Sequence, residues 1–278
     1  MGSIKAKILA GLSAGTTGYL CAIPLNLPRG INLFINNTFL ESATCISDVL
    51  NELGYNQRAI LGYDFNFVGS RYLFASHNIE AYDLNYFRNE LEIESGFWGI
   101  KDAQVLNLAK KFLSNYDFKA PFALYLSTVD THGPKGFLDK VYCPNLEYGL
   151  NGAIECGNRI LNDFISWIKT QEFYKDTTII IVGDHLAWGV GDMENRFIYN
   201  VFINPSFSKI PGADLIKNRK LSHFDISALI LDSLNIPTQY FGLGRNPLYQ
   251  KTLLEIYGID EFNKQISSDS RFYESLWR

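Results

Sequence analysis

Apolar residues follow two different periods along this chain, and each period predicts one kind of secondary structure. Apolar side chains spaced roughly three to four residues apart indicate amphipathic helices. These stretches cover residues 41–53, 102–113, 154–168 and 225–234. Short apolar runs rich in β-branched residues are typical of buried strands. The runs cover residues 58–63, 121–129 and 177–182.

The order of these stretches predicts the fold class. Strands alternate with helices, which is typical of an α/β fold with a mostly parallel central sheet flanked by helices. We expect the runs at 121–129 and 177–182 to be interior strands of one sheet that end at the same edge. After Leu254 the sequence becomes polar, so we expect one domain over residues 1–254 and a polar surface tail over 255–278.

Composition and charge exclude several classes of protein. Hydrophobic residues make up 47% and charged residues 19% of the 278 residues, which is ordinary for a globular protein with a large core. Disordered and low-complexity classes are therefore excluded. The formal net charge is −4. Nucleic-acid-binding proteins usually carry a basic excess, so we expect no nucleic-acid partner.

Carboxylates and histidines follow two of the predicted strands, where an α/β sheet binds its ligands. Asp184 and His185 come directly after the run of β-branched residues, and this pair suits a divalent metal ion. Asp130 and His132 follow the other apolar run. One such loop alone is more often a solvated turn with a capping side chain. Two of them at two strand ends favour a catalytic or metal site.

A glycine-rich stretch at residues 14–25 adds hydroxyl groups at Thr16 and Thr17, and Ser13 directly precedes it. A hydroxyl on a turn that leads into a helix lies among free backbone N–H groups, which suit a phosphate or sulfate. A metal ion would lower the pKa of that hydroxyl and make it a nucleophile. A packing helix of small residues and a cleaved leader are the alternatives for this stretch.

His223 stands just before a predicted helix. An N-terminal cap formed there by Ser222 or Asp225 is favoured over a ligand role for His223.

The 4 cysteines lie in two local pairs, Cys21 with Cys45 and Cys143 with Cys156. Neither pair has the CxxC spacing of a zinc or redox site. Two disulfides, which imply an oxidising compartment, and buried thiols in a cytosolic protein are both open at this point.

Several segments together resemble the alkaline phosphatase/sulfatase superfamily. In chain order they are AGTTGYLCAIPL, CISDVLNELGYNQRAILGYDFNFVG, LYLSTVDTHGPKGF, KDTTIIIVGDHLA and FGLGRNPL. The resemblance runs from about Ala14 to Leu248. It is closest to the membrane-anchored phosphoglycerol transferases of osmoregulated periplasmic glucans, while lipoteichoic acid synthases and phosphoethanolamine transferases are more distant. The resemblance also favours the two disulfides Cys21–Cys45 and Cys143–Cys156.

The resemblance implies an alkaline-phosphatase-like fold with one bound Mn²⁺ or Zn²⁺. Asp184 and His185 match the Asp-His pair of metal ligands in the family. In one register Thr16 matches the threonine that is both the nucleophile and a metal ligand, with Ser13 and Thr17 as alternatives. In the register of the glucan transferases, Leu12 stands at that position instead.

Two further residues match substrate contacts of the family. His132 matches the histidine that contacts the phosphoryl group or the leaving oxygen. Arg71 lies within one residue of a basic position that holds the substrate phosphate. The first strand of the family, which ends in an acidic metal ligand, has no counterpart here, so we expect residues 1–254 to be a catalytic domain truncated before that strand.

The implied reaction transfers phosphoglycerol from phosphatidylglycerol to a glycan or glycolipid acceptor through a phospho-threonine intermediate. The implied place is the periplasmic face of the bacterial inner membrane, with membrane association through segments absent from this chain. One alternative is a phosphoethanolamine transferase of the same superfamily. The other is a truncated, non-catalytic domain that binds lipid headgroups or glycans.

Overall fold

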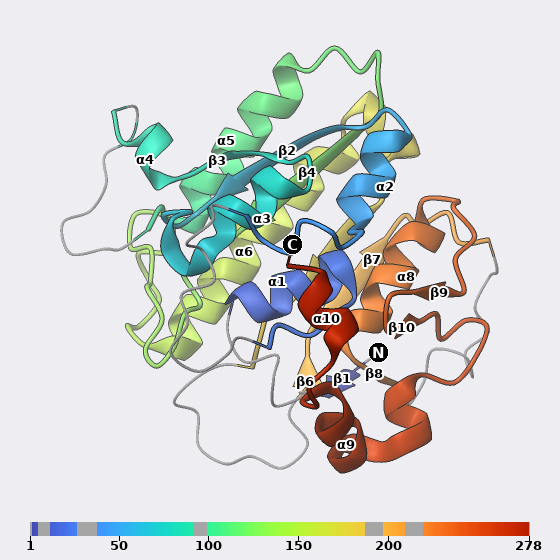
Figure 1. Ribbon diagram of the computed structural model, residues 1–278. Coiled ribbons are helices and arrows are strands. Elements are labelled where there is room, and N and C mark those ends of the chain that lie inside the picture. Colours follow the sequence, from blue (N-terminus) through green and yellow to red (C-terminus); the bar gives the residue numbers. More distant parts are fainter. Residues whose placement is uncertain are drawn as a thin grey trace. The chain divides into compact units, whose positions relative to one another are not determined.

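The computed structural model describes residues 2–4, 12–26, 38–89, 91, 99–186, 197–208 and 219–277 (Figure 1). The chain forms two compact units. Unit 1 comprises Met1–Val49, Lys175–Leu186 and Asp192–Arg278, and unit 2 comprises Leu50–Tyr174 and Ala187–Gly191.

A three-stranded parallel sheet forms the centre of unit 2, with the strand order β3-β2-β4. The strands are β2 (Asn56–Leu61), β3 (Glu80–Tyr82) and β4 (Phe122–Ser127). In β2, Asn56 is paired with Phe122 of β4 and Leu61 with Ser127, so the two strands run in register over their whole length. The strands predicted at 58–63 and 121–129 are confirmed with shifted ends, and the parallel pairing confirms the α/β class.

Helices cover this sheet. α5 packs against β2 and β4, and α6 packs against α5 (Figure 1). The helices of unit 2 are α3 (Ser70–Ser76), α4 (Leu84–Phe87), α5 (Asp102–Asn115) and α6 (Leu150–Lys169), with a 3₁₀ turn at Phe67–Gly69. Val105, Ala109 and Leu113 of α5 are buried at helical spacing, which is why the helix at 102–113 was predictable. The helix predicted at 154–168 is also confirmed and is longer than predicted.

Two elements cross the sequence boundary between the units, α2 (Ile46–Glu52) and the 3₁₀ turn Glu172–Asp176. α2 begins later than the predicted helix at 41–53. The Asp48 carboxylate accepts the backbone N–H of Cys45 at 2.8 Å, and this bond sets the helix start at Ile46. Gly54, with a φ of 81°, follows the end of α2 as a glycine stop signal predicts.

Short strands of unit 1 form three separate sheets among its described residues. β5 pairs antiparallel with β7, β1 lies between β6 and β8, and β9 pairs with β10. The strands are β1 (Gly2–Ile4), β5 (Ile179–Val182), β6 (Phe197–Ile198), β7 (Asn200–Ile203), β8 (Lys220–Leu221), β9 (Tyr240–Phe241) and β10 (Gly244–Arg245). The strand predicted at 177–182 is confirmed as β5, while the expectation that it shares a sheet with the strand at 121–129, which belongs to unit 2, stays a prediction. β5 takes its pairing partner from the returning chain at β7.

Two helices pack together in unit 1, α1 (Leu12–Cys21) and α8 (His223–Ser233). The Ser227 hydroxyl of α8 donates to the backbone oxygens of Gly18 at 3.2 Å and Tyr19 at 2.8 Å in α1. α8 begins with a capping box in which the Asp225 carboxylate accepts the backbone N–H of Ser222 at 2.7 Å. The predicted cap at this helix is therefore confirmed.

The chain after Leu254 differs from the polar surface tail that the sequence predicts. It forms α9 (Leu253–Ile266) and α10 (Arg271–Ser275). Phe262 and Ile266 are buried in one cluster with Phe224 of α8 and Ala14 of α1. Leu254 is buried in the same cluster, and Leu253 and Ile259 pack against it, so α9 carries an apolar face that the expectation of a polar tail overlooked.

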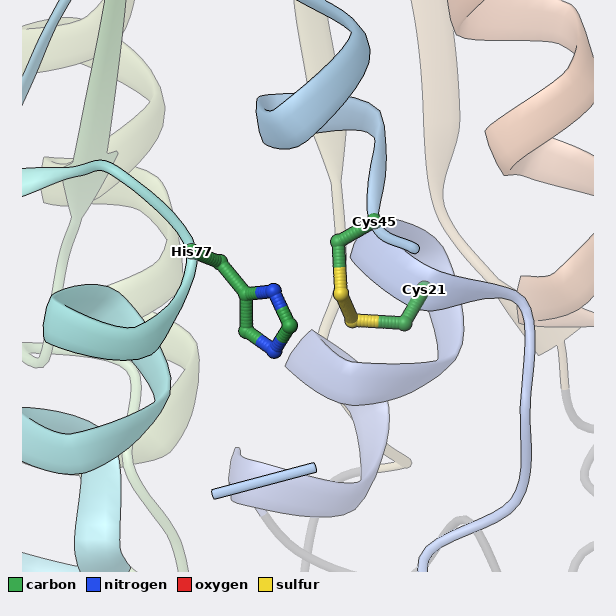
Figure 2. Close-up of side chains that lie close together, drawn as sticks. All are labelled: Cys21, Cys45 and His77. Atoms are coloured by element: carbon green, nitrogen blue, oxygen red, sulfur yellow. A yellow bond between two sulfur atoms is a disulfide. The ribbon is translucent and has the colours of Figure 1, made fainter. Parts of the chain in front are cut away.

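Both predicted disulfides are present, Cys21–Cys45 and Cys143–Cys156. Figure 2 shows the bond that ties Cys21, at the end of α1, to Cys45, just before α2. No free cysteine occurs among the described residues. Among the described helices, none combines the length and the apolar character needed to cross a bilayer.

Removing the Phe262 ring tests whether the C-terminal helices belong to the core. Phe262 is 2% exposed, and we expect Phe262→Ala to lower the free energy of unfolding by about 3–5 kcal/mol. The matched control is Phe272→Ala on α10, whose side chain is 74% exposed and should change stability by less than about 0.5 kcal/mol. Urea denaturation measures both, and equal effects of the two substitutions would contradict the packing of α9.

Candidate active site

Asp184 and His185 directly follow β5, where the predicted metal pair was placed. The Asp184 carboxylate is oriented by the backbone N–H of His185, which donates to Oδ1 at 2.8 Å. Its other oxygen, Oδ2, lies 3.4 Å from Nε2 of His185. The Asp184 side chain is 37% exposed and that of His185 only 13%. The pair is therefore mostly buried on the His185 side and accessible to solvent on the Asp184 side.

The hydrogen bonds of His185 select the tautomer that a metal ligand needs. Nδ1 lies 2.8 Å from the backbone oxygen of Leu186. Because a carbonyl oxygen only accepts, Nδ1 carries the proton, and Nε2 is the ring nitrogen that lies toward Asp184 Oδ2. A tetrahedral ion with bonds of about 2.0–2.1 Å separates neighbouring ligand atoms by about 3.3–3.4 Å. The spacing and the tautomer therefore both fit a divalent ion.

Helix α1 approaches this pair through Gly15. A Cβ atom on Gly15 would lie 2.1 Å from the backbone oxygen of Asp184, a distance that real Cβ atoms do not show. Only glycine lets the helix backbone come this near to the end of β5. The hydroxyl-bearing helix and the Asp-His pair, which are far apart in sequence, thus meet within unit 1.

The three candidate hydroxyls of α1 differ in their surroundings. The helix begins at Leu12, so Thr16 and Thr17 stand in its second turn, and the expectation of a hydroxyl on a turn before the helix is wrong for both. Thr16, which is 6% exposed, makes a side-chain hydrogen bond with Tyr19. Thr17 is fully buried, and its hydroxyl has no hydrogen-bond partner among the described residues. Ser13 is 8% exposed.

Tyr19 interacts with both the Thr16 hydroxyl and the charge of Asp184. Burial raises the pKa of the Tyr19 phenol to about 12, and the nearby Asp184 charge adds to the rise, while the hydrogen bond with Thr16 opposes it. Tyr19 therefore stays protonated at neutral pH and is a neutral hydrogen-bond partner of the Thr16 hydroxyl. Tyr19 was not singled out from the sequence, and the close approach of Gly15 to the Asp184 backbone was not predicted, because both depend on contacts between distant segments.

His223 contacts the backbone just before the Asp184–His185 pair. Its imidazole is fully buried, and Nε2 lies 2.9 Å from the backbone oxygen of Gly183, the residue before Asp184. Nδ1 has no hydrogen-bond partner among the described residues. Burial lowers the pKa of His223, so the ring is neutral and donates through Nε2 to Gly183. The structure thus gives His223 a contact with the site, beyond its place next to the cap of α8.

In unit 2, His132 lies on a tight loop after β4. The loop is closed by backbone hydrogen bonds from His132 to Val129 at 3.0 Å and from Phe137 to Asp130 at 2.7 Å. The imidazole is exposed at the tip of this loop. Its approach to Asp184 and His185, which belong to unit 1, stays a prediction.

Asp102 and Asp130 fix the base of the His132 loop. Asp102, the first residue of α5, accepts the backbone N–H groups of Val129 at 2.7 Å and Asp130 at 3.0 Å through Oδ1. The Asp130 carboxylate accepts the N–H of Asp102 at 3.2 Å in return. Both side chains are buried, and Oδ1 of Asp130 has no partner among the described residues. Burial, followed by the charge of Asp102, raises the pKa of Asp130 to about 8.

Arg71, the predicted phosphate contact, lies on α3 of unit 2 with an exposed side chain. Its guanidinium is 3.4 Å from the Asn66 amide oxygen and 5.5 Å from the centre of the Phe65 ring. Its role toward a substrate stays a prediction, as does that of His132.

These features define an α/β protein with a metal-type pair at a strand end, faced by a helix that carries hydroxyl groups. The sulfatase family model matches residues 30–192, more than half of the chain, and the chain therefore belongs to the sulfatase family. The matched stretch includes Asp184 and His185, while α1 precedes it. Members of this superfamily use a divalent metal ion, in agreement with the fit at Asp184 and His185.

Curated relatives point in the same direction. The chain is 29% identical over 253 residues to phosphoglycerol transferase I of Xanthomonas campestris, covering 84% of this chain and 35% of that protein. It is 30% identical over 264 residues to phosphoglycerol transferase I of Salmonella choleraesuis, covering 88% of this chain and 33% of that protein. The chain thus spans about a third of the length of these relatives.

Among solved structures, the lipoteichoic acid synthase LtaP from Listeria monocytogenes shares the fold, with a TM-score of 0.67 and 16% sequence identity. The similarity covers 89% of this chain and 64% of that chain. It confirms the alkaline-phosphatase-like α/β architecture that the sequence segments indicate.

Replacing Gly15 by alanine tests the approach of α1 to Asp184. The new methyl group would collide with a backbone oxygen that cannot move freely, and we expect Gly15→Ala to cost about 1–3 kcal/mol of stability. The matched control is Gly157→Ala in α6, where the nearest side-chain atom lies 3.5 Å away. That substitution should be neutral or stabilise by up to about 1 kcal/mol through helix propensity. Two equal effects in urea denaturation would refute the close contact.

The Asp102–Asp130 pair predicts a pH dependence of stability. Because the folded state raises the pKa of Asp130 to about 8, it holds a proton that the unfolded chain loses near pH 4. The stabilisation is complete at low pH and is lost as the pH rises toward 8. We expect Asp130→Asn to remove this loss and to be more stable than the parent by at least about 1 kcal/mol at pH 8.

Urea denaturation at pH 5, 7 and 9 measures this effect. The control Asp176→Asn, at a carboxylate whose side chain is 78% exposed, should keep the parent's pH profile. A profile of Asp130→Asn that is parallel to the parent's would show that Asp130 keeps an ordinary pKa in the folded state.

Proposed function

We propose that this chain is the catalytic domain of a metal-dependent phosphoglycerol transferase. The observation that carries the proposal is the close approach of Gly15 to the Asp184 backbone, because α1 is the helix that carries the candidate hydroxyls. Family membership supports phosphoryl-transfer chemistry at such a site. The curated relatives named phosphoglycerol transferase I support phosphoglycerol as the group that is transferred.

Asp184 and the Nε2 atom of His185 would hold one divalent ion, with Mn²⁺ or Zn²⁺ as the proposed metals. When bound, this ion supplies positive charge near the phosphate oxygens and lowers the pKa of a nearby hydroxyl. The carboxylate is a hard anionic ligand and the imidazole a borderline one, a combination that both metals accept.

Thr16 is the proposed nucleophile and a further ligand. Its neighbour Gly15 approaches the Asp184 backbone, and the charge of Asp184 acts on its hydrogen-bond partner Tyr19, and both observations support a Thr16 oxygen near the pair. Its side chain reaches the surface slightly, whereas Thr17 is fully buried and less accessible to a substrate. Tyr19 orients the Thr16 hydroxyl.

The proposed reaction has two displacements. The Thr16 oxygen attacks the phosphorus of phosphatidylglycerol, the bond to the diacylglycerol oxygen breaks, and diacylglycerol leaves with a proton. A hydroxyl of a glycan or glycolipid acceptor then attacks the phosphoglyceryl-threonine, and the Thr16 hydroxyl is regenerated. On unit 2, His132 is proposed to contact the phosphoryl group or the leaving oxygen, and Arg71 to hold the substrate phosphate.

The periplasmic face of the bacterial inner membrane is the proposed place of action. Two disulfides persist in an oxidising compartment, which supports the periplasm. A phospholipid donor places the reaction at a membrane surface.

Incubating the purified chain with phosphatidylglycerol and Mn²⁺ tests this function. We expect release of diacylglycerol and a phosphoglyceryl adduct on Thr16, located by peptide mass spectrometry. Thr16→Ala should abolish the adduct, and Thr16→Ser should retain it because a hydroxyl remains. Asp184→Ala should weaken Mn²⁺ or Zn²⁺ binding more than about tenfold in calorimetry, since it removes an anionic ligand.

The control for metal binding is Asp176→Ala, which removes an exposed carboxylate away from the pair. An adduct on Ser13 or Thr17 would reassign the nucleophile. Release of a headgroup from phosphatidylethanolamine alone would identify a phosphoethanolamine transferase. Unchanged metal affinity in Asp184→Ala, together with no donor turnover, would leave a non-catalytic binding domain as the function.

A further inference from the structure

A hollow of about 650 Å³ lies on unit 2 between the loop that carries His132 and the start of α6. Pro134, two residues after His132, forms one wall. The segment Asn145–Gly152 and Glu155 form the rest. The volume is in the range of pockets that hold small organic ligands, which span about 300–1,000 Å³. None of the reaction steps proposed above uses this pocket.

The loop around the pocket is pinned from several sides, so the pocket is preformed. The disulfide Cys143–Cys156 ties the loop to α6. Lys140 donates from Nζ to the backbone oxygens of Pro144 and Leu146. Preformed sites bind with a smaller loss of conformational entropy, because the loop need not be ordered by the ligand.

Two further contacts hold the same loop. The Asp139 carboxylate accepts the backbone N–H groups of Val141 at 2.9 Å and Tyr142 at 3.0 Å. At the other end, a Cβ atom on Gly152 would lie 2.0 Å from the backbone oxygen of Glu147, so the chain folds back tightly on itself. The backbone that carries the lining side chains is therefore held in one conformation.

The chemistry of the lining fits a neutral polyhydroxyl ligand. The amides of Asn145 and Asn151 both donate and accept, and the carboxylates of Glu147 and Glu155 accept, which matches the mixed donors and acceptors of sugar hydroxyls. Tyr148 is 78% exposed and presents an aromatic ring on which the apolar face of a sugar ring can pack.

The charges of the lining disfavour an anion. No lysine or arginine is among the lining residues, and an anion would face two carboxylates. The nearby Lys140 ammonium already donates to two carbonyl oxygens, and it lies 4.8 Å from the centre of the Tyr148 ring. A phosphorylated headgroup is thus a poor match. The hydroxyl groups of a neutral sugar, in contrast, can donate hydrogen bonds to the two carboxylates.

We propose that this pocket binds a neutral sugar of the acceptor glycan, an assignment of the acceptor subsite that rests on the proposed function. Because Pro134 lies on the loop of His132, a sugar bound here is held beside the residue proposed to contact the phosphoryl group. By binding the rest of the sugar ring, the pocket orients one sugar hydroxyl toward that residue.

Binding of a neutral glucose oligosaccharide to the purified chain, without donor lipid, tests the pocket directly. Calorimetry or nuclear magnetic resonance titration should detect binding with a dissociation constant of about 1 mM or tighter. Tyr148→Ala should weaken it about fivefold or more through the lost ring contact. A uronic acid oligosaccharide of equal length should bind at least tenfold more weakly, and the double variant Glu147→Gln/Glu155→Gln should reduce this discrimination.

The matched control is Tyr86→Ala on α4, an exposed tyrosine outside the pocket that should leave binding unchanged. In transfer assays, Tyr148→Ala should raise KM for the acceptor. The rate of diacylglycerol release without acceptor, when water takes the phosphoglyceryl group, should stay the same. Absence of binding by the neutral oligosaccharide, or equal affinity of Tyr148→Ala and the parent chain, overturns the assignment. Binding without any donor turnover keeps the pocket as a sugar site and contradicts the proposed transferase function instead.

Discussion

The contact between helix α1 and the backbone of Asp184 is the constraint on which the candidate site depends. A helix and a strand end normally stay apart by the length of a side chain, but at Gly15 nothing separates the helix from the Asp184 oxygen. Helix α1 is also held by α8, because Ser227 of α8 donates to two of its carbonyl oxygens. The disulfide at Cys21 then fixes the end of the same helix.

Helix starts hold the other chemical groups in place. His223, the first residue of α8, donates to Gly183 and so steadies the strand end that carries the metal-type pair. Asp102, the first residue of α5, accepts two N–H groups at the base of the His132 loop. In both cases a buried side chain at a helix start satisfies backbone groups of a loop that would otherwise be left without partners. This arrangement makes each loop as rigid as the helix behind it.

The two disulfides serve different parts of the proposed reaction. Cys21–Cys45 anchors the helix of the proposed nucleophile in unit 1, and Cys143–Cys156 frames the pocket proposed for the acceptor sugar in unit 2. In each unit a disulfide thus constrains the segment that is proposed to bind one of the two substrates. Rigid positioning matters for a two-step transfer, because an acceptor hydroxyl held in the correct geometry competes with water for the same intermediate.

The sequence by itself determined the main helices and strands, the position of Asp184 and His185 after a strand, and the cap at Ser222 and Asp225. These features depend on residues that are neighbours in the chain, so local periodicity and capping chemistry are sufficient to predict them. The resemblance to a known family also identified the pairing of the cysteines. The prediction of a polar tail failed at α9, because it overlooked an apolar face whose Phe262 and Ile266 pack in the core.

Only the tertiary structure decided which glycine the site requires, where α1 begins and what holds the His132 loop. Gly15 is needed because of a strand end far along the chain, and Asp102 meets its partner Val129 across 27 residues. The same holds for the pairing of β5 with β7. Contacts between distant segments leave no period in the sequence, because each depends on how the chain folds back on itself rather than on its neighbouring residues.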